Sequence, residues 1–151
     1  MRIVEHWTQD IKSAFGDTPE SAKAVLAEQM YHAYALKVYD MVKYFPEDQE
    51  KQSQGIDFYI KKNRWKRPYG VDVKANLSSK GIFIIDNTKD RWLHSMYNKN
   101  DRVCHICVET RYAIEYDRLQ MSNYLCTLPD DMVKYSYIDS SINHLVRRFV
   151  V

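Results

Sequence analysis

The amino-acid sequence predicts a single α/β domain in which helices flank a mixed β-sheet. Three observations lead to this class. A strong helix start at residues 18–20 precedes a long apolar pattern, two strand-like runs enclose a polar loop at 61–68, and further apolar runs follow at 81–86 and 102–108. The 151 residues are enough for one domain over 1–151, which would bury roughly 68–70% of its unfolded surface.

The first predicted element is a long N-terminal helix. Thr18 is a favoured N-cap residue, Pro19 suits the first helical position, and Glu20 adds an acid to the first turn. Apolar residues then recur on two stripes, and Pro46 stops the pattern. We therefore expect one helix from Thr18 to about Phe45, buried on more than one side.

A β-hairpin is predicted next. The runs Gly55–Ile60 and Tyr69–Asn76 alternate apolar and polar residues, which is typical of strands. The segment Lys61–Pro68 is polar, charged and ends in proline, so it predicts the hairpin loop. In a register that closes this loop, Asp57 and Asp72 are cross-strand neighbours, with β-carbons about 4.5–5.5 Å apart.

The period of two gives this hairpin a core face and an open face. Val71 and Val73 need the core, so Asp72 and Lys74 share the other face. Apolar neighbours likewise commit Asp57 to the open face of the first strand. Carboxylates this close repel each other unless a cation lies between them, and hard oxygen ligands suit a magnesium ion.

Asp57, followed by Asp72-Val73-Lys74, resembles the signature of the PD-(D/E)XK nuclease superfamily. The first acid follows Gly-Ile here, where the family name has proline, a departure that is common in the superfamily. The resemblance covers about residues 18–110. It implies a restriction-endonuclease-like or Holliday-junction-resolvase-like fold, with a long N-terminal helix before a catalytic β-hairpin.

The resemblance also implies an activity and a cofactor. The protein would be a metal-dependent nuclease, above all a DNA endonuclease, that uses Mg²⁺ with Mn²⁺ as a substitute. Asp57, Asp72 and the backbone carbonyl of Val73 would hold the ion. Lys74 would orient or deprotonate the attacking water and offset charge in the transition state.

Two further expectations come from the same resemblance. The helix before the hairpin often carries an acid that reaches the metal shell, and Glu28 is the first candidate for this role. Glu20 is the alternative, although it also suits the helix dipole. Small nucleases of this kind often dimerise to cut two strands, so a homodimer is one expected assembly.

The hairpin loop is strongly basic and contains one tryptophan. The residues of this loop with a candidate role are Lys61, Lys62, Arg64, Trp65, Lys66 and Arg67. Such cations attract phosphate backbones and an aromatic ring can stack on an unpaired base, so we expect nucleic acid to bind beside the carboxylates. The alternative is a non-catalytic nucleic-acid-binding or partner-binding module that uses loop 61–67, with Asp72 and Lys74 as a solvent-facing pair.

The rest of the chain predicts more strands and helices. Gly81–Asp86 is so apolar that we expect a third strand buried on both faces, and strands also follow at 102–108 and 112–116. A short helix is expected over 117–125, with Asp117 as its cap. Acid and serine pairs at 130–131 and 140–141 suggest two more helix starts, and His94 is a minor candidate for a general acid or phosphate contact.

Cys104 and Cys107 have the spacing of half a zinc site. Residues three apart on a strand point to opposite faces, so these two side chains would not share a metal. Apolar neighbours favour a strand here, and we expect both cysteines to be buried in it.

Composition narrows the function classes. No run approaches the ~20 apolar residues of a membrane span, and the N-terminus lacks the core of a signal peptide. Three cysteines fit a reducing compartment, so we expect an intracellular, cytoplasmic protein without a membrane partner. Only four glycines are present and none forms a phosphate-binding loop, which argues against nucleotide-driven chemistry.

Overall fold

A computed structural model gives the structure of residues 2–3, 20–81, 84–86, 97–127, 135–137 and 144–151, and the description below is confined to them. Its elements, in chain order, are β1 (Arg2–Ile3), α2 (Glu20–Val38), β2 (Met41–Tyr44), α3 (Gln49–Ser53), β3 (Phe58–Lys61), β4 (Tyr69–Lys74), β5 (Ile84–Asp86), β6 (Arg102–Ile106), β7 (Tyr112–Asp117), α4 (Arg118–Cys126), β8 (Tyr135–Tyr137) and β9 (Val146–Val150).

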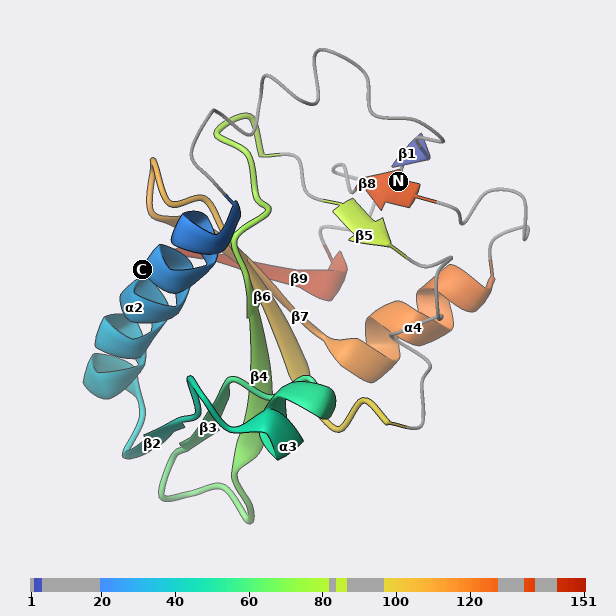
Figure 1. Ribbon diagram of the computed structural model, residues 1–151. Helices are drawn as coiled ribbons and strands as arrows, with labels where there is room; N and C mark the ends of the chain where they lie inside the picture. The colour runs from blue at the N-terminus through green and yellow to red at the C-terminus, as the bar shows by residue number, and fades with distance from the viewer. Residues whose placement is uncertain (1, 4–19, 82–83, 87–96, 128–134, 138–143) are drawn as a thin grey trace.

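A mixed six-stranded sheet forms the centre of the molecule. Its strand order is β2-β3-β4-β6-β7-β9. The β4–β6 pair is parallel and the other four neighbouring pairs are antiparallel. Helix α2 lies against one face and α4 lies on the other side (Figure 1). The predicted α/β class with a mixed sheet is therefore confirmed.

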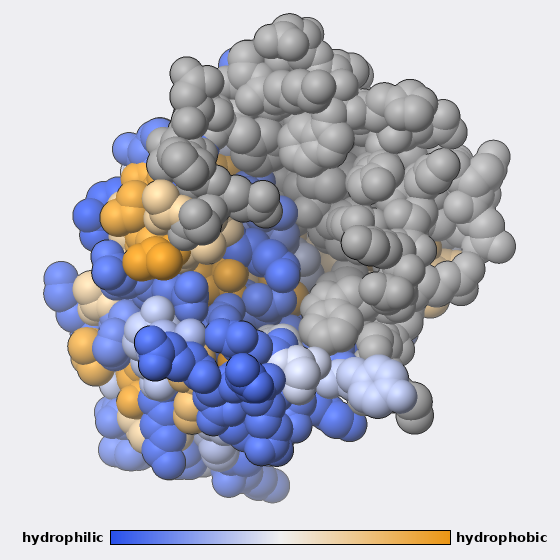
Figure 2. Space-filling model, in the orientation of Figure 1, coloured by the Kyte–Doolittle hydropathy of each residue, from blue (hydrophilic) through white to orange (hydrophobic). Residues whose placement is uncertain are grey.

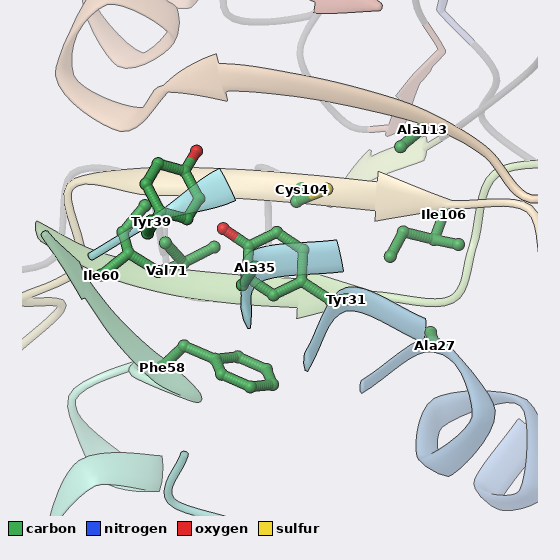
Figure 3. Close-up of a cluster of buried hydrophobic side chains, with 10 residues drawn as sticks. All are labelled: Ala27, Tyr31, Ala35, Tyr39, Phe58, Ile60, Val71, Cys104, Ile106 and Ala113. Atoms are coloured by element: carbon green, nitrogen blue, oxygen red, sulfur yellow. The ribbon is translucent and has the colours of Figure 1, made fainter. Parts of the chain in front are cut away.

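The face under α2 carries the larger core cluster (Figure 3). Its buried members are Ala27, Tyr31, Ala35, Tyr39, Phe58, Ile60, Val71, Cys104, Ile106 and Ala113. The helix contributes residues spaced four apart, which lie on one stripe. The strands contribute alternate residues, as the pleat requires.

A second cluster fills the opposite face, between the sheet and α4. Its buried members are Leu77, Val103, Cys107, Ile114, Tyr116, Met121 and Leu125. Because the sheet is covered on both faces, a polar side chain on either face is partly removed from water unless it lies near an edge or a strand end.

The predicted helix end at Phe45 is wrong. Helix α2 ends at Val38, and Met41–Tyr44 form the edge strand β2, which pairs antiparallel with β3. This pairing satisfies backbone groups along the edge of β3, and it packs Val42 and Tyr44 against the α2 core. A continued helix would have left that strand edge open.

Helix α2 is also not buried on more than one side, as the two apolar stripes had suggested. Val25 is 52% exposed and Leu36 is 61% exposed, and both belong to the first of the two expected stripes, Ala22, Val25, Leu26, Ala33 and Leu36. Figure 2 shows apolar residues gathered on the surface over this helix. Helix α2 instead packs on the sheet through a stripe of small and aromatic residues, because the alanine side chains allow a close approach.

The elements predicted for the later part of the chain are found only in part. Strands β6 and β7 and helix α4 lie where they were expected. Strand β5 forms and pairs with β8 in a separate three-stranded sheet of order β1-β8-β5. Its side chains, which were expected to be buried on both faces, lie outside the described part of the structure. The two expected helix starts at 130–131 and 140–141 lie outside the described residues; Tyr135–Tyr137 form β8, and residues 144–145 form a 3-10 turn directly before β9. His94 lies outside the described residues.

The cap of α4 provides a test of local stability. Asp117 is in the extended region, and its carboxylate accepts from the backbone N–H of Gln120 at 2.9 Å. Replacing Asp117 with Ala should cost about 1 kcal/mol of unfolding free energy, because the N–H loses its acceptor. Urea unfolding should show this loss, whereas Asp117→Asn, which keeps a capping oxygen, should stay near wild type. Equal losses in the two variants would contradict the cap.

Candidate functional site

The site begins at the open end of the β3–β4 hairpin. The ladder ends with Phe58 paired to Val71, and Asp57 and Asp72 are the next residues of the two segments beyond this pair. The backbone N–H of Asp57 donates to the carbonyl of Val71 at 2.9 Å, and Asp57 Oδ2 accepts from the N–H of Val73 at 2.7 Å. The carboxyl group of Asp72 lies within hydrogen-bonding reach of that of Asp57. The predicted proximity of the two acids is confirmed.

Lys74 lies beside the acid pair, as the alternation predicted. Its Nζ is 3.1 Å from Asp72 Oδ2. The parallel ladder pairs Asp72 with Val103 and Lys74 with His105, so these residues share one face of the sheet. The attraction of Asp72 raises the pKa of Lys74, which therefore stays an ammonium.

This face is not open at Asp72, which corrects the sequence-based expectation. The Asp72 side chain is 9% exposed, whereas that of Lys74 is 43% exposed. The alternative interpretation of a solvent-facing ion pair therefore fails for the acid. The physical reason is the parallel strand β6, which places Val103 of the second core cluster next to Asp72.

Burial and repulsion act together on the acid pair. Burial, and after it the nearby charge of Asp72, raises the pKa of Asp57 to about 8, against the opposing effect of the Val73 N–H. At neutral pH, two ionised carboxylates here are costly unless a proton or a cation lies with them. The fully ionised form of the pair is thus destabilised. Two carboxylates that bind a cation repel each other in the same way when the cation is absent.

Glu28 approaches the same place from α2. It is half-buried, and its carboxylate accepts a hydrogen bond from the Tyr44 hydroxyl. Burial raises the pKa of Glu28, and so does the charge of Asp72, while the Tyr44 hydrogen bond lowers it. Helix α2 thus brings Glu28 close enough for its charge to act on Asp57 and Asp72, and its contact with a metal ion stays a prediction. The side chain of Glu20 is outside the described part of the structure.

A three-ligand cluster does not form, however. Among the described residues, no three side chains of Asp, Glu, His or Cys lie close enough together to hold one metal ion. The donor set that remains is the Asp57–Asp72 pair, with the backbone of Val73 next to it. This set fits Mg²⁺, because Mg²⁺ keeps several of its waters and is often bound through one or two carboxylates.

The basic loop does not lie beside the carboxylates, contrary to expectation. It closes the hairpin at the end opposite to Asp57, at the lower end of Figure 1. Four strand steps from Asp57 to Lys61 span roughly 13 Å. A bound nucleic acid would therefore have to cover both ends of the hairpin to contact both groups.

Two residues of the loop are part of the fold. Arg67 forms a bidentate pair with Asp101, at 2.7 and 3.1 Å. The half-buried Trp65 ring lies 5.6 Å from the Tyr39 ring and 4.8 Å from the Tyr69 ring. Its expected stacking on a base would compete with these ring contacts.

The other cations of the loop differ in exposure. Lys61 Nζ donates to the carbonyl of Lys62, and Lys62 Nζ lies over the Tyr39 ring, 5.9 Å from its centroid. Arg64 and Lys66 are exposed. These last two are the members of the loop best placed to meet a phosphate backbone.

Cys104 and Cys107 lie in different core clusters, on opposite faces of the sheet. Both thiols are buried and free. This placement confirms the period-two argument that separated them.

Three polar residues near the site had no role in the sequence-based interpretation. Tyr44 was assigned to the helix, so its contact with Glu28 was missed. His105 and Tyr116 are buried polar neighbours of the site on the face of Lys74. For His105 and Tyr116, the only signal in the sequence was their position in the alternating pattern of the predicted strands, which indicates the face of the sheet.

Comparisons with protein-family models, with curated proteins and with solved structures gave no match to this chain. The PD-(D/E)XK assignment accordingly remains a resemblance. In the part of the chain that the structure describes, no helix is both long and apolar enough to cross a bilayer.

Proposed function

We propose that this protein is a Mg²⁺-dependent nuclease, most plainly a DNA endonuclease, with a restriction-endonuclease-like core. The observation that supports it best is the set Asp57, Asp72 and Lys74. Two carboxyl groups lie side by side at the end of a hairpin, and an ammonium group is 3.1 Å from one of them. Two carboxylates that repel each other without a cation can bind a divalent metal ion, and an ammonium group beside them can offset negative charge on a phosphate. This combination suits phosphodiester hydrolysis.

Each residue has a defined part in this proposal. Asp57, Asp72 and the carbonyl of Val73 would hold the ion, and Glu28 would support it from α2. When bound, the ion polarises the scissile phosphate and lowers the pKa of the attacking water. Lys74 stays protonated beside Asp72, so it orients that water and offsets charge on the phosphate rather than acting as the base.

The direct test is incubation of the protein with supercoiled, linear, branched and single-stranded DNA and with RNA. We expect cleavage of at least one DNA with Mg²⁺ or Mn²⁺ and none with EDTA. Binding without cleavage under all conditions would favour the non-catalytic module that uses loop 61–67.

The two exposed cations of the loop give a separate prediction. Replacing Arg64 and Lys66 with Gln should weaken duplex DNA binding and reduce the log–log salt slope by roughly 0.9 for each phosphate that is no longer neutralised. Fluorescence anisotropy at several salt concentrations measures this slope. Lys80→Gln, which removes an exposed cation outside the loop, is the matched control. An unchanged slope in the double variant would contradict a role of these two cations in DNA binding and would mean that the loop is only a solvated hairpin tip.

A further inference from the structure

A buried carboxylate with two arginine partners lies on the face of the sheet under α2, and the proposed mechanism does not use it. Glu115 is 4% exposed, and the ladders of β7 pair it with Cys104 on one side and Arg147 on the other. Its Oε1 accepts from Arg102 Nη1 at 3.5 Å and from Arg147 Nη2 at 3.3 Å. Among the described residues, neither arginine forms an ion pair with another acid. One of the two positive charges is therefore left without a negative partner.

The geometry of this cluster differs from that of an ion pair that only stabilises the fold. Arg67 and Asp101 form a bidentate pair in which each carboxylate oxygen has its own donor, at 2.7 and 3.1 Å. At Glu115 both guanidinium groups use the same oxygen, and both contacts are longer than the roughly 2.7–2.9 Å of a strong charge-assisted hydrogen bond. Glu115 Oε2 has no hydrogen-bond partner in the part of the chain that the structure describes. Compensating Glu115 thus uses little of the hydrogen-bonding capacity of the two arginines.

Aromatic rings hold both guanidinium groups in place. Arg102 Cζ lies 5.1 Å from the centroid of the Trp65 ring and 5.1 Å from that of the Tyr69 ring. Arg147 Cζ lies 4.1 Å from the centroid of the Phe149 ring. A ring below the guanidinium plane attracts the cation without accepting from the N–H donors at its edge. Side chains that are already ordered in this way lose little rotamer freedom when they bind an anion.

The two arginines reach the surface, although their carboxylate does not. The Arg102 side chain is 27% exposed and the Arg147 side chain is 49% exposed. Each guanidinium has five N–H donors. Within the described residues, Arg102 donates to Glu115 alone, and Arg147 donates to Glu115 and to the Tyr34 hydroxyl. Most of the donors can therefore bind a ligand that approaches from solvent.

This pair of arginines is separate from the acid pair. Val103 lies beside Asp72 in the β4–β6 ladder and shares its face, so the preceding residue, Arg102, belongs to the opposite face. Arg102 instead adjoins the basic loop through its contact with Trp65. An anion held by Arg102 would accordingly not be the phosphate that the proposed mechanism places at Asp72.

The spacing of the two guanidinium groups suits one phosphate group. Their nearest nitrogens lie within 3.5 Å of one oxygen atom and hence at most about 7 Å apart, a distance that the oxygens of a phosphate can bridge. We propose that Arg102 and Arg147 form a phosphate-binding site on the α2 face, beside the basic loop, which takes a phosphate of a nucleic-acid backbone or a free phosphate. This inference goes beyond the proposed nuclease function and does not depend on metal-dependent cleavage.

The test is isothermal titration calorimetry in EDTA at constant ionic strength. The probes are inorganic phosphate and two short single-stranded DNA oligonucleotides that are identical except for a 5′-phosphate. Arg102→Gln and Arg147→Gln should each weaken binding about 10- to 100-fold, the range for removal of a hydrogen bond to a charged group. Lys80→Gln, which removes an exposed cation elsewhere, should bind as the wild type does.

A third arginine variant separates a built site from general attraction between charges. Arg147→Lys keeps the positive charge but lacks the planar fork, so it should recover only part of the lost affinity. Wild-type affinity in Arg147→Lys would contradict a site built from two guanidinium groups. If Arg102→Gln folds poorly, the two Arg147 variants still decide the question, because Arg102 remains to pair with Glu115. Urea unfolding measures the structural cost of each change separately.

The remaining outcomes identify the source of the phosphate or overturn the site. Equal affinity for the two oligonucleotides, lost in the arginine variants, would support a site for the phosphodiester backbone. Tighter binding of the 5′-phosphorylated oligonucleotide, lost in the same variants, would support a site for a terminal or free phosphate. No binding of any probe, or equal affinities in the wild type and both glutamine variants, would overturn the inference. The cleavage assay tests the nuclease proposal independently of all these results.

Discussion

Replacing Asp72 with Asn is expected to reduce Mg²⁺-dependent cleavage by several orders of magnitude. The variant lacks the ionised oxygen that pairs with the metal and with Lys74 Nζ, 3.1 Å away. Removal of several kcal/mol of transition-state stabilisation corresponds to several decades in rate. Single-turnover cleavage of the preferred DNA, with the wild type and the variant at equal concentrations, measures the effect.

Two controls keep this result specific to the site. Asp117→Asn makes the same change of carboxylate to carboxamide at the α4 cap and should cleave at the wild-type rate. The far-ultraviolet circular dichroism of Asp72→Asn should match that of the wild type. Cleavage by Asp72→Asn at the wild-type rate would remove this residue from the mechanism.

Without metal, the protein should become less stable as the pH rises from about 5 to 8. The pKa of Asp57 is raised to about 8 in the folded protein by burial and then by Asp72. In the unfolded chain it is about 3.9. Between these values the folded state keeps a proton that the unfolded state has released, so the unfolding free energy falls with rising pH. The total decrease is on the order of a few kcal/mol at most.

Urea unfolding in EDTA at pH 5, 6.5 and 8 measures this trend. Asp57→Asn should flatten it and be more stable than the wild type at pH 8, because the carboxamide is neutral and its oxygen can still accept from the Val73 N–H. Mg²⁺ should raise the wild-type midpoint at pH 8 and leave that of Asp57→Asn nearly unchanged. A wild-type pH dependence in Asp57→Asn would show that this carboxyl does not carry the effect.

The sequence alone was sufficient for the hairpin and for the acid pair. Alternation commits Phe58 and Val71 to the core, and only one register of two adjacent strands satisfies both while closing the loop. That register ends beside Asp57 and Asp72 and so brings them close together, and Lys74 lies on the same face as Asp72. These are short-range consequences of a period of two, so local residues determine them.

Long-range pairing decided the rest. Residues after Val38 suit a helix as well as a strand, and only the open edge of β3 selects β2, which carries Tyr44 to Glu28. The burial of Asp72 depends on the parallel β4–β6 pair. A parallel pair joins segments whose connection is long, and no local pattern specifies which strand becomes the neighbour. Tertiary structure therefore determined what surrounds the acids, because their neighbours come from distant parts of the chain.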